Sequence, residues 1–233
     1  MHIHIGDKWG QRYDHARYYI HYVPFKIKYG IKFTHWYKHA EILKDPTMYD
    51  KPHFIPEEGN VIFDIGSQYG DYAILWEKRN NAKVYAFELL LRNWIEMQKD
   101  IQLNQCNVQA YNMAIGNGEN VWYKENSDMA TKTEISDNWT TTIPLDDFVE
   151  KYNIIPQIIK IDVEGFELNV LEGAKNTLQT YHPKIIIETH SKELRKKCNE
   201  FLNNLNYCLF YEGRYGNSNG WMDEIVNLFY GRN

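Results

Sequence analysis

Short apolar runs alternate with segments of helical periodicity through the middle of the chain. Five runs have the length of buried strands, and most segments between them repeat apolar residues at the spacing of a helix. Strands are therefore predicted at residues 61–65, 83–87, 108–113, 158–162 and 184–189, with helices at 70–79, 91–103 and 166–173. Where a helix joins two strands, those strands should be parallel and connected by a right-handed crossover.

The alternation changes in two places. Residues 207–211 and 225–230 are apolar and aromatic and are joined by a loop rich in Gly and Asn, which is typical of a β-hairpin. Residues 120–143 are polar and threonine-rich and predict a short β excursion over one end of the sheet. The predicted fold is α/β: a doubly wound, mostly parallel seven-stranded Rossmann-like sheet with an antiparallel C-terminal edge hairpin.

The loop after the first strand carries a chemical signal. Gly66 and Gly70 follow the strand that contains Asp64, and glycines there let the backbone approach a bulky ligand. The pattern is Gly-x-x-x-Gly, with Gln68 where a dinucleotide fingerprint has glycine for the pyrophosphate. S-adenosylmethionine (SAM) has no phosphate, and the acid that ends the next strand, Glu88, suits its ribose hydroxyls. The spacing favours SAM over a dinucleotide, or over a strand-turn-helix without a ligand.

A second segment has a more specific pattern. Residues 160–167 read Lys-Ile-Asp-Val-Glu-Gly-Phe-Glu, and residues 170–174 read Val-Leu-Glu-Gly-Ala. These motifs resemble the signature of the FkbM-type family of SAM-dependent methyltransferases, and the likeness spans roughly residues 55–210. The family usually has Ala and Asn where this chain has Ser67 and Gln68. The resemblance implies a class I methyltransferase with a Rossmann-like fold.

Ligands of such sheets bind beyond the carboxyl ends of the strands, which brings the strand-terminal polar residues together. We expect the methionine part of SAM to meet the glycine loop, its ribose to meet Glu88, its adenine to lie near residues 112–114, and its sulfonium to face Asp162 and Glu164. The predicted cofactor-binding residues are Asp64, Gly66, Ser67, Gln68, Tyr69, Gly70, Glu88, Leu89, Asn112, Met113, Ala114 and Asp162.

An alcohol acceptor must also lose a proton, which requires a base within hydrogen-bond reach. The candidates are His190, Asp162, Glu164 and Glu188. His190 ends the fifth strand and its unperturbed pKa would be about 6.5, although a capping or surface histidine fits the sequence as well. Asp162 and Glu164 could share a hard cation, but they could equally hold the acceptor or fix the loop through Lys160, so no metal is predicted.

The N-terminal segment is chemically distinct. The 233-residue chain has a net charge of −5, yet residues 1–53 hold nine Lys or Arg against five Asp or Glu, and seven of the nine histidines. We expect residues 1–54 to form a helical or irregular extension and residues 55–233 to form the SAM-binding domain. The extension could pack against the sheet as an extra helix and hairpin, or cap the acceptor side of the site, and the two can coexist.

The predicted function is methyl transfer to a hydroxyl of a sugar or another small metabolite. O-methylation follows from the resemblance, whereas the residues alone leave nitrogen and carboxylate acceptors open. The alternatives are a dinucleotide-dependent oxidoreductase and a non-catalytic SAM-binding protein. A nucleic-acid acceptor is disfavoured because the basic excess is small and the whole chain is acidic.

A cytoplasmic location is expected. No apolar run reaches the roughly 20 residues of a membrane helix, and no signal-peptide pattern is present. The sequence does not predict an oligomeric state.

Overall fold

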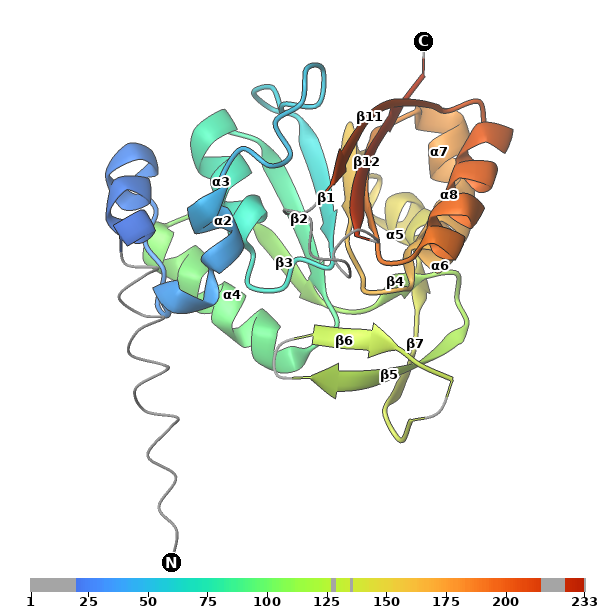
Figure 1. Cartoon of the computed structure of the whole chain (residues 1–233), viewed down its shortest axis with the longest axis horizontal. Helices are drawn as coiled ribbons and strands as arrows, with labels where there is room; N and C mark the ends of the chain where they lie inside the picture. The colour runs from blue at the N-terminus through green and yellow to red at the C-terminus, as the bar shows by residue number, and fades with distance from the viewer. Residues whose placement is uncertain (1–19, 127–128, 135, 215–224, 233) are drawn as a thin grey trace, which may run out of the picture.

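The computed structural model describes residues 20–126, 129–134, 136–214 and 225–232. Its central sheet is formed by β1 (Val61–Ile65), β2 (Lys83–Glu88), β3 (Gln109–Asn112), β9 (Ile158–Ile161), β10 (Lys184–Thr189), β11 (Cys208–Arg214) and β12 (Val226–Gly231). These seven strands are ordered β11-β12-β10-β9-β1-β2-β3 (Figure 1). Because β1 is followed by β2 on one side and flanked by β9 on the other, the strand order reverses beside β1.

The predicted fold class is confirmed, and the structure adds one detail of the strand order. β1 pairs in parallel with both β2 and β9, and β9 with β10. The C-terminal pair lies at the sheet edge, but β12 is the antiparallel strand and is inserted between β10 and β11. All six residues of β12 are buried, which agrees with a strand that has neighbours on both sides.

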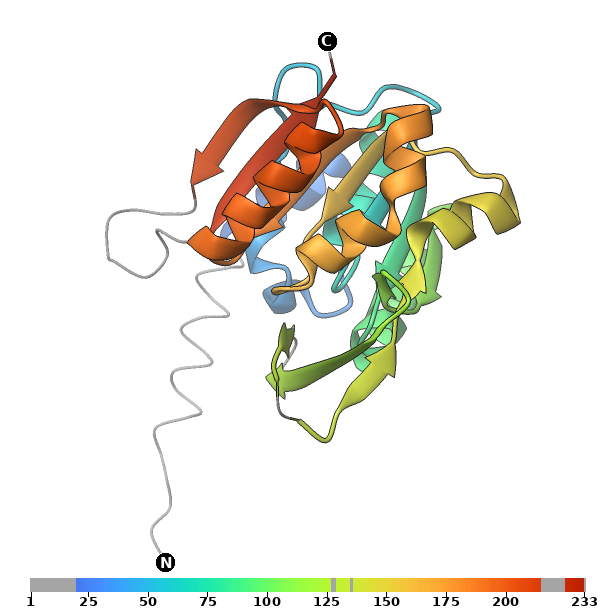
Figure 2. The ribbon, with the colours of Figure 1, turned by 90° about the vertical axis from the view of Figure 1, so that its right-hand side faces the viewer.

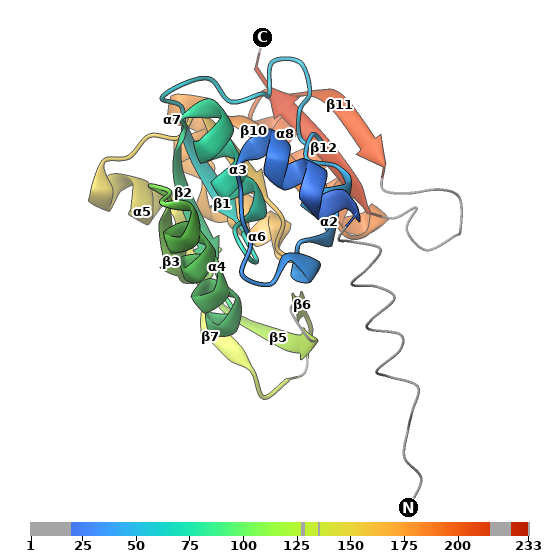
Figure 3. The ribbon, with the colours of Figure 1, turned by 90° about the vertical axis from the view of Figure 1, so that its left-hand side faces the viewer.

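Helices cover both faces of the sheet, as the crossovers require. One face carries α3 (Asp71–Asn80) and α4 (Leu91–Asn104), and the other carries α5 (Leu145–Tyr152), α6 (Glu167–Gly173), α7 (Lys175–Tyr181) and α8 (Lys192–Asn204). Figure 2 shows the second face and Figure 3 the first. Each face has its own buried cluster of apolar side chains. In the described part of the chain, no helix combines the length and apolarity needed to cross a membrane.

The N-terminal region forms a further layer over the first face. Residues 20–29 are helical and are followed by η1 (Trp36–Lys38) and α2 (Ala40–Lys44). Five consecutive residues of α3, Tyr72 to Trp76, are buried, whereas a surface helix would bury only one stripe. The extra layer explains this, because it covers the side of α3 that faces away from the sheet.

The expectation of a hairpin in this extension is wrong for the described residues 20–54, which contain helices and turns but no strand. The segment packs on α3 and α4 instead of pairing with the sheet. Two side chains of these helices bond to it: Arg79 of α3 makes two 2.7 Å hydrogen bonds to Asp50, and Asp100 of α4 accepts one at 2.6 Å from the backbone N–H of Thr34.

The predicted β excursion is present. β5 (Asn120–Asn126) pairs antiparallel with β6 (Met129–Lys132) and with β7 (Trp139–Thr141). Two short strands, β4 (Ile115–Gly116) and β8 (Ile143–Pro144), join the base of this excursion in parallel. In Figures 1 and 2 the excursion projects from the end of the molecule at which β3 finishes.

Candidate active site

A cavity lies beyond the carboxyl ends of the parallel strands, next to the reversal of strand order. It is open to solvent on one side and combines apolar side chains with several carboxylates. Its walls come from the loops after β1, β2, β3, β9 and β10, from the β excursion and from α2. The lining residues are Glu41, Ile65, Gly66, Gln68, Phe87, Glu88, Leu89, Met113, Ala114, Ile115, Val121, Met129, Ala130, Thr142, Asp162, Val163, Glu164, Phe166 and Glu188.

The loop after β1 is drawn tightly against the loop after β9. Gly66 has a φ of +79°, and a Cβ added to it would stand 1.7 Å from the carbonyl oxygen of Asp162. The backbone N–H groups of Gly66 and Ser67 both donate to the carbonyl of Phe87, at 2.9 and 3.1 Å. Only glycine fits this position, because any side chain would push the two loops apart.

Glu88, at the end of β2, is held by the loops on either side. One carboxylate oxygen accepts from the backbone N–H of Gln68 at 2.9 Å, and the other from that of Leu90 at 2.9 Å. Burial raises the pKa of Glu88 to about 7, although these hydrogen bonds act in the opposite direction. The carboxylate lines the cavity. Oε1 also accepts from the amide of Asn93 at 3.3 Å, whereas Oε2 has a further lone pair with which to accept a hydrogen bond.

Asp64, in contrast, faces away from the cavity. Its carboxylate is 1% exposed and lies 3.1 Å from the ammonium of Lys160, which is also 3.5 Å from Asp162. Burial raises the pKa of Asp64, while Lys160 lowers it. For Lys160 burial lowers the pKa, but the neighbouring carboxylates outweigh this and raise it. This buried ion pair ties β1 to β9 beneath the site.

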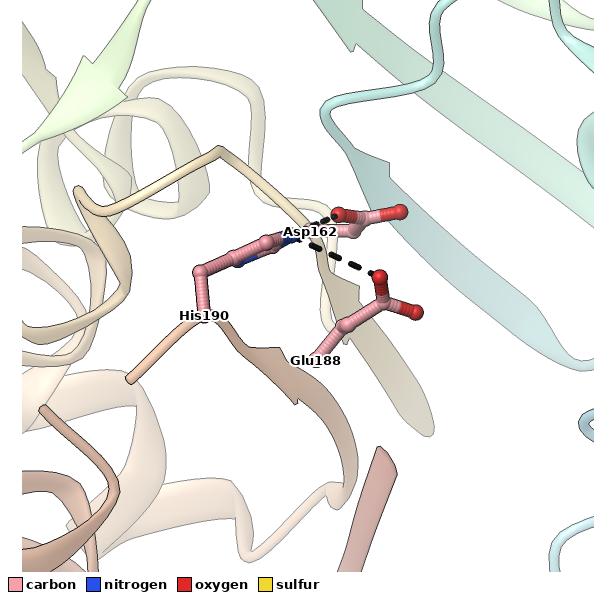
Figure 4. Close-up of side chains that lie close together, drawn as sticks. All are labelled: Asp162, Glu188 and His190. Carbon is pink, nitrogen blue, oxygen red and sulfur yellow. Dashed lines mark ion pairs between the residues drawn. The ribbon is translucent and has the colours of Figure 1, made fainter. Parts of the chain in front are cut away.

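His190 is surrounded by carboxylates. Its Nδ1 lies 2.8 Å from Oε1 of the fully buried Glu167, and its Nε2 lies 3.8, 3.6 and 3.5 Å from oxygens of Asp162, Glu164 and Glu188 (Figure 4 draws two of these three). Burial lowers the pKa of His190, but hydrogen bonds and charges from the acids outweigh it and raise the pKa to about 11. A histidine protonated at neutral pH cannot accept a proton, and His190 does not line the cavity.

The pKa values of Glu188 and Glu164, next to His190, are shifted as well. Burial, and then the charge of Asp162, raise the pKa of Glu188 to about 7. Burial also raises the pKa of Glu164, against the nearby His190. Glu167 was not singled out as a site residue from the sequence, although it lies inside the FkbM-like motif. Its partner His190 is 23 residues away, so only the fold brings the two together.

The site residues predicted from the sequence divide into two groups. Those that line the cavity are Gly66, Gln68, Glu88, Leu89, Met113, Ala114, Asp162, Glu164 and Glu188. Those outside its lining are Asp64, Ser67, Tyr69, Gly70, Asn112 and His190. Asn112 instead donates from its amide at 2.9 Å to the carbonyls of Glu88 and Leu89. Gly70 packs on Met97, where a Cβ would come within 2.7 Å. These side chains support the loops that form the wall.

Glu41 of α2 is a lining residue that the sequence reasoning missed. Nothing local could have found it, because the N-terminal segment has no motif and its helix reaches the cavity only through packing on α3 and α4.

Comparison with known proteins agrees with this geometry. Residues 64–211 match the Methyltransferase FkbM domain, and that range is more than half of the chain. The chain belongs to this family. The match confirms the resemblance seen in residues 160–174, and the chain carries a methyltransferase domain.

A curated relative is the hexuronic acid methyltransferase AglP of Haloferax volcanii. It is 29% identical over 142 residues, a stretch that covers 58% of this chain and 58% of the relative. The matched region thus spans somewhat over half the length of that protein.

Solved structures share the fold. The FkbM methyltransferase of Methylobacillus flagellatus superposes with a TM-score of 0.54 at 16% identity, covering 83% of this chain and 53% of that one. A methyltransferase of Pyrococcus furiosus superposes with a TM-score of 0.53 at 15% identity, covering 94% of this chain and 97% of that one. The precorrin-6y C5,15-methyltransferase of Geobacter metallireducens superposes with a TM-score of 0.53 at 12% identity, covering 82% of this chain and 87% of that one. At these identities the likeness shows the Rossmann-like fold of methyltransferases.

Proposed function

We propose that the chain is a SAM-dependent O-methyltransferase whose acceptor is a hydroxyl of a sugar or another small polar molecule. The observation that carries this proposal is the position of the cavity. It lies at the reversal of strand order, with the backbone of Gly66 on one side and the carboxylate of Glu88 on the other.

The cavity suits the parts of SAM one by one. Glu88 can accept hydrogen bonds from the ribose hydroxyls, and the apolar side chains of Leu89 and Met113 can flank the adenine. SAM carries a net positive charge, and five acids line the wall: Glu41, Glu88, Asp162, Glu164 and Glu188. No Lys, Arg or His is among the lining residues of the described chain. Charge therefore favours a cationic cofactor over a nicotinamide dinucleotide, whose phosphates are anionic.

The same charge guides the choice of acceptor. The relative AglP is named for a hexuronic acid, which supports an acceptor of the sugar class. A carboxylate acceptor would meet a wall of acids that repels it, whereas a neutral hydroxyl would find hydrogen-bond acceptors there. A hydroxyl of a neutral sugar is therefore the preferred target.

Bound SAM supplies an activated methyl group, so the protein mainly has to align the acceptor and remove its proton. We assign the base role to Glu164 instead of His190. Glu164 lines the cavity, and its side chain is 28% exposed, more than Asp162 or Glu188 beside it. Its φ is +53°, which is uncommon for a residue other than glycine, and such backbone conformations concentrate at functional sites.

The N-terminal region would complete the acceptor side. Glu41 brings α2 to the cavity, so residues 20–54 form one wall of the site as well as a layer over α3. This arrangement supports the role of the extension as an acceptor-side cap.

Titration calorimetry with S-adenosylhomocysteine, SAM and NADH tests the cofactor. Binding of the first two without NADH is expected. Screening sugars by mass spectrometry for the gain of one methylene then tests the reaction. NADH binding would favour an oxidoreductase, and SAM binding without any product across neutral, anionic and amine acceptors would favour a non-catalytic binding protein.

A further inference from the structure

Three side chains at the carboxyl ends of β9 and β10 are arranged like the ligands of a metal ion, and two of them, Asp162 and Glu188, line the cavity. Asp162 follows β9, and Glu188 and His190 lie at the end of β10 (Figure 4). One ligand atom from each residue can be chosen so that all three lie within 4.8 Å of one another. Two ligands on opposite sides of one ion are about 4 Å apart, since metal–ligand distances are roughly 2.0–2.2 Å. A small adjustment of the side chains would bring all three atoms onto one ion, which would take the place of the proton on Nε2 of His190.

The histidine is oriented for this role. Because Glu167 accepts at Nδ1 of His190, the imidazole is fixed with its Nε2 facing Asp162 and Glu188. Histidines that bind metals usually donate their other ring N–H to a carboxylate or carbonyl in this way. Glu167 is fully buried, and its Oε1 also accepts from the backbone N–H of Gly165 at 3.1 Å, so the anchoring carboxylate is itself held in place.

An independent observation comes from Glu188. Its side chain lines the cavity, the residue is only 8% exposed, and its Oε2 is buried without a hydrogen-bond partner. A buried carboxylate oxygen without a partner is costly, since neither water nor a donor offsets its desolvation. A cation held by both oxygens of Glu188 would satisfy Oε2 together with Oε1, the oxygen that lies 3.5 Å from Nε2 of His190.

The local charge favours a cation as well. Four acids surround His190, namely Asp162, Glu164, Glu167 and Glu188. The nearest lysine, Lys160, is shared between Asp162 and the buried Asp64. The number of acids therefore exceeds the number of cationic side chains within this group.

We propose that Asp162, Glu188 and His190 form a binding site for a divalent transition-metal ion. Two carboxylates and one imidazole suit Mn²⁺, Fe²⁺ or Zn²⁺ better than Ca²⁺, which prefers oxygen ligands alone. The sequence predicted no metal because Asp162 and Glu164 could equally hold the acceptor or fix the loop through Lys160. The fold instead brings Asp162 together with Glu188 of β10 and with His190, which directly follows β10. Resting on the proposed function, such an ion would bind the acceptor hydroxyl and orient it beside Glu164.

Mn²⁺ binding, followed by electron paramagnetic resonance, tests the site directly. The wild-type protein should bind one Mn²⁺ per chain, and the spin-echo spectrum should show a coordinated nitrogen that is lost in His190→Ala. Glu188→Gln and Asp162→Asn should weaken binding by at least about tenfold, and Glu167→Gln, which touches no metal, by about 10- to 100-fold. Glu150→Gln, an exposed acid on α5, is the matched control and should bind like the wild type.

Thermal unfolding shows whether each variant is folded. Because both Glu188→Gln and Asp162→Asn are measured, the test still stands if one of them fails to fold. Absence of saturable Mn²⁺ binding, or equal binding by the wild type, Glu188→Gln and Asp162→Asn, would overturn the site. If methyl transfer proceeds in chelator-treated protein that binds no Mn²⁺, the proposed function stands and this inference fails. If Mn²⁺ binds but SAM does not, the metal site stands and the proposed function fails.

Discussion

Nε2 of His39 lies 3.1 Å from Oδ2 of Asp100, and both side chains are 2% exposed. Nδ1 of the same imidazole is hydrogen-bonded to Asp71, and the ring stacks on Phe33 with a centroid distance of 3.8 Å. Asp71 begins α3 and Asp100 lies in α4. A single buried histidine therefore joins the N-terminal layer to both helices that support the glycine loop.

This arrangement predicts a pH-dependent stability. Burial lowers the pKa of His39, but Asp71 and Asp100 outweigh it and raise the pKa from 6.5 to about 9. The folded state thus holds this proton more tightly than the unfolded state. The stabilisation should be complete below about pH 6.5 and should be lost as the pH rises to about 9, by roughly 2–3 kcal/mol. Urea unfolding of the wild type and of His39→Gln, between pH 6 and about 9.5, measures it.

The difference in unfolding free energy between these two proteins should shrink as the pH rises, because Gln carries no titrating proton. A constant difference would show that the His39 charge does not contribute. Taking a difference also removes the contribution of Glu88, whose pKa of about 7 affects both proteins alike.

Replacing Glu88 with Ala should weaken the binding of S-adenosylhomocysteine by about 1–3 kcal/mol, since charge-assisted hydrogen bonds to the ribose would be lost. Titration calorimetry measures the change. Glu150→Ala removes an exposed acid on α5 and should leave the affinity unaltered. Equal affinities of the wild type and Glu88→Ala would rule out the ribose role.

Replacing Glu164 with Gln should lower kcat by about 10²–10⁴, the usual contribution of a general base, because the amide cannot take the acceptor proton. The affinity for S-adenosylhomocysteine should stay close to that of the wild type, since this product lacks the sulfonium charge that Glu164 is expected to face. Steady-state kinetics with an identified acceptor, beside calorimetry, separate the two effects. Full turnover in Glu164→Gln would transfer the base role to Asp162 or Glu188.

Two glycines with nearly the same backbone geometry allow a matched comparison. Gly59 and Gly66 have φ values of +78° and +79°, but a Cβ on Gly59 would meet nothing within 4 Å, whereas one on Gly66 would stand 1.7 Å from the carbonyl oxygen of Asp162. Gly59→Ala should therefore cost only the strain of its φ, about 1–2 kcal/mol.

Gly66→Ala should cost clearly more and should abolish S-adenosylhomocysteine binding, because the loops after β1 and β9 must separate. Urea unfolding and calorimetry on the two variants check this. Similar unfolding free energies would mean that the close approach of these loops is unimportant for stability.

Local pattern was sufficient for most of the framework. The apolar runs at 61–65, 83–87 and 184–189 are β1, β2 and β10 within a residue, because a strand buried on both faces requires continuous apolar side chains. The glycine at position 66 and the acid at position 88 were likewise readable, since a close backbone approach and a strand-terminal carboxylate are features of short segments.

Only the tertiary structure decided which side chains meet. Asp64 was expected at the cofactor, but it pairs with Lys160, a residue of a strand 96 positions further along the chain. His190 was one of four candidates for the base, but the surrounding acids, among them Glu167, raise its pKa to about 11. Glu41 reaches the cavity through packing of a segment without a motif.

The physical reason for this division between sequence and tertiary structure is the range of the interactions. Hydrophobic periodicity and backbone conformation depend on neighbours a few residues away, so the sequence by itself determined the strands, the helices and the family motif. Ion pairs, burial and pKa values depend on strand order and on how layers pack, and these bring together residues that the chain separates by tens of positions. The tertiary structure therefore decided the chemistry of the acids around His190 and the insertion of β12 between β10 and β11.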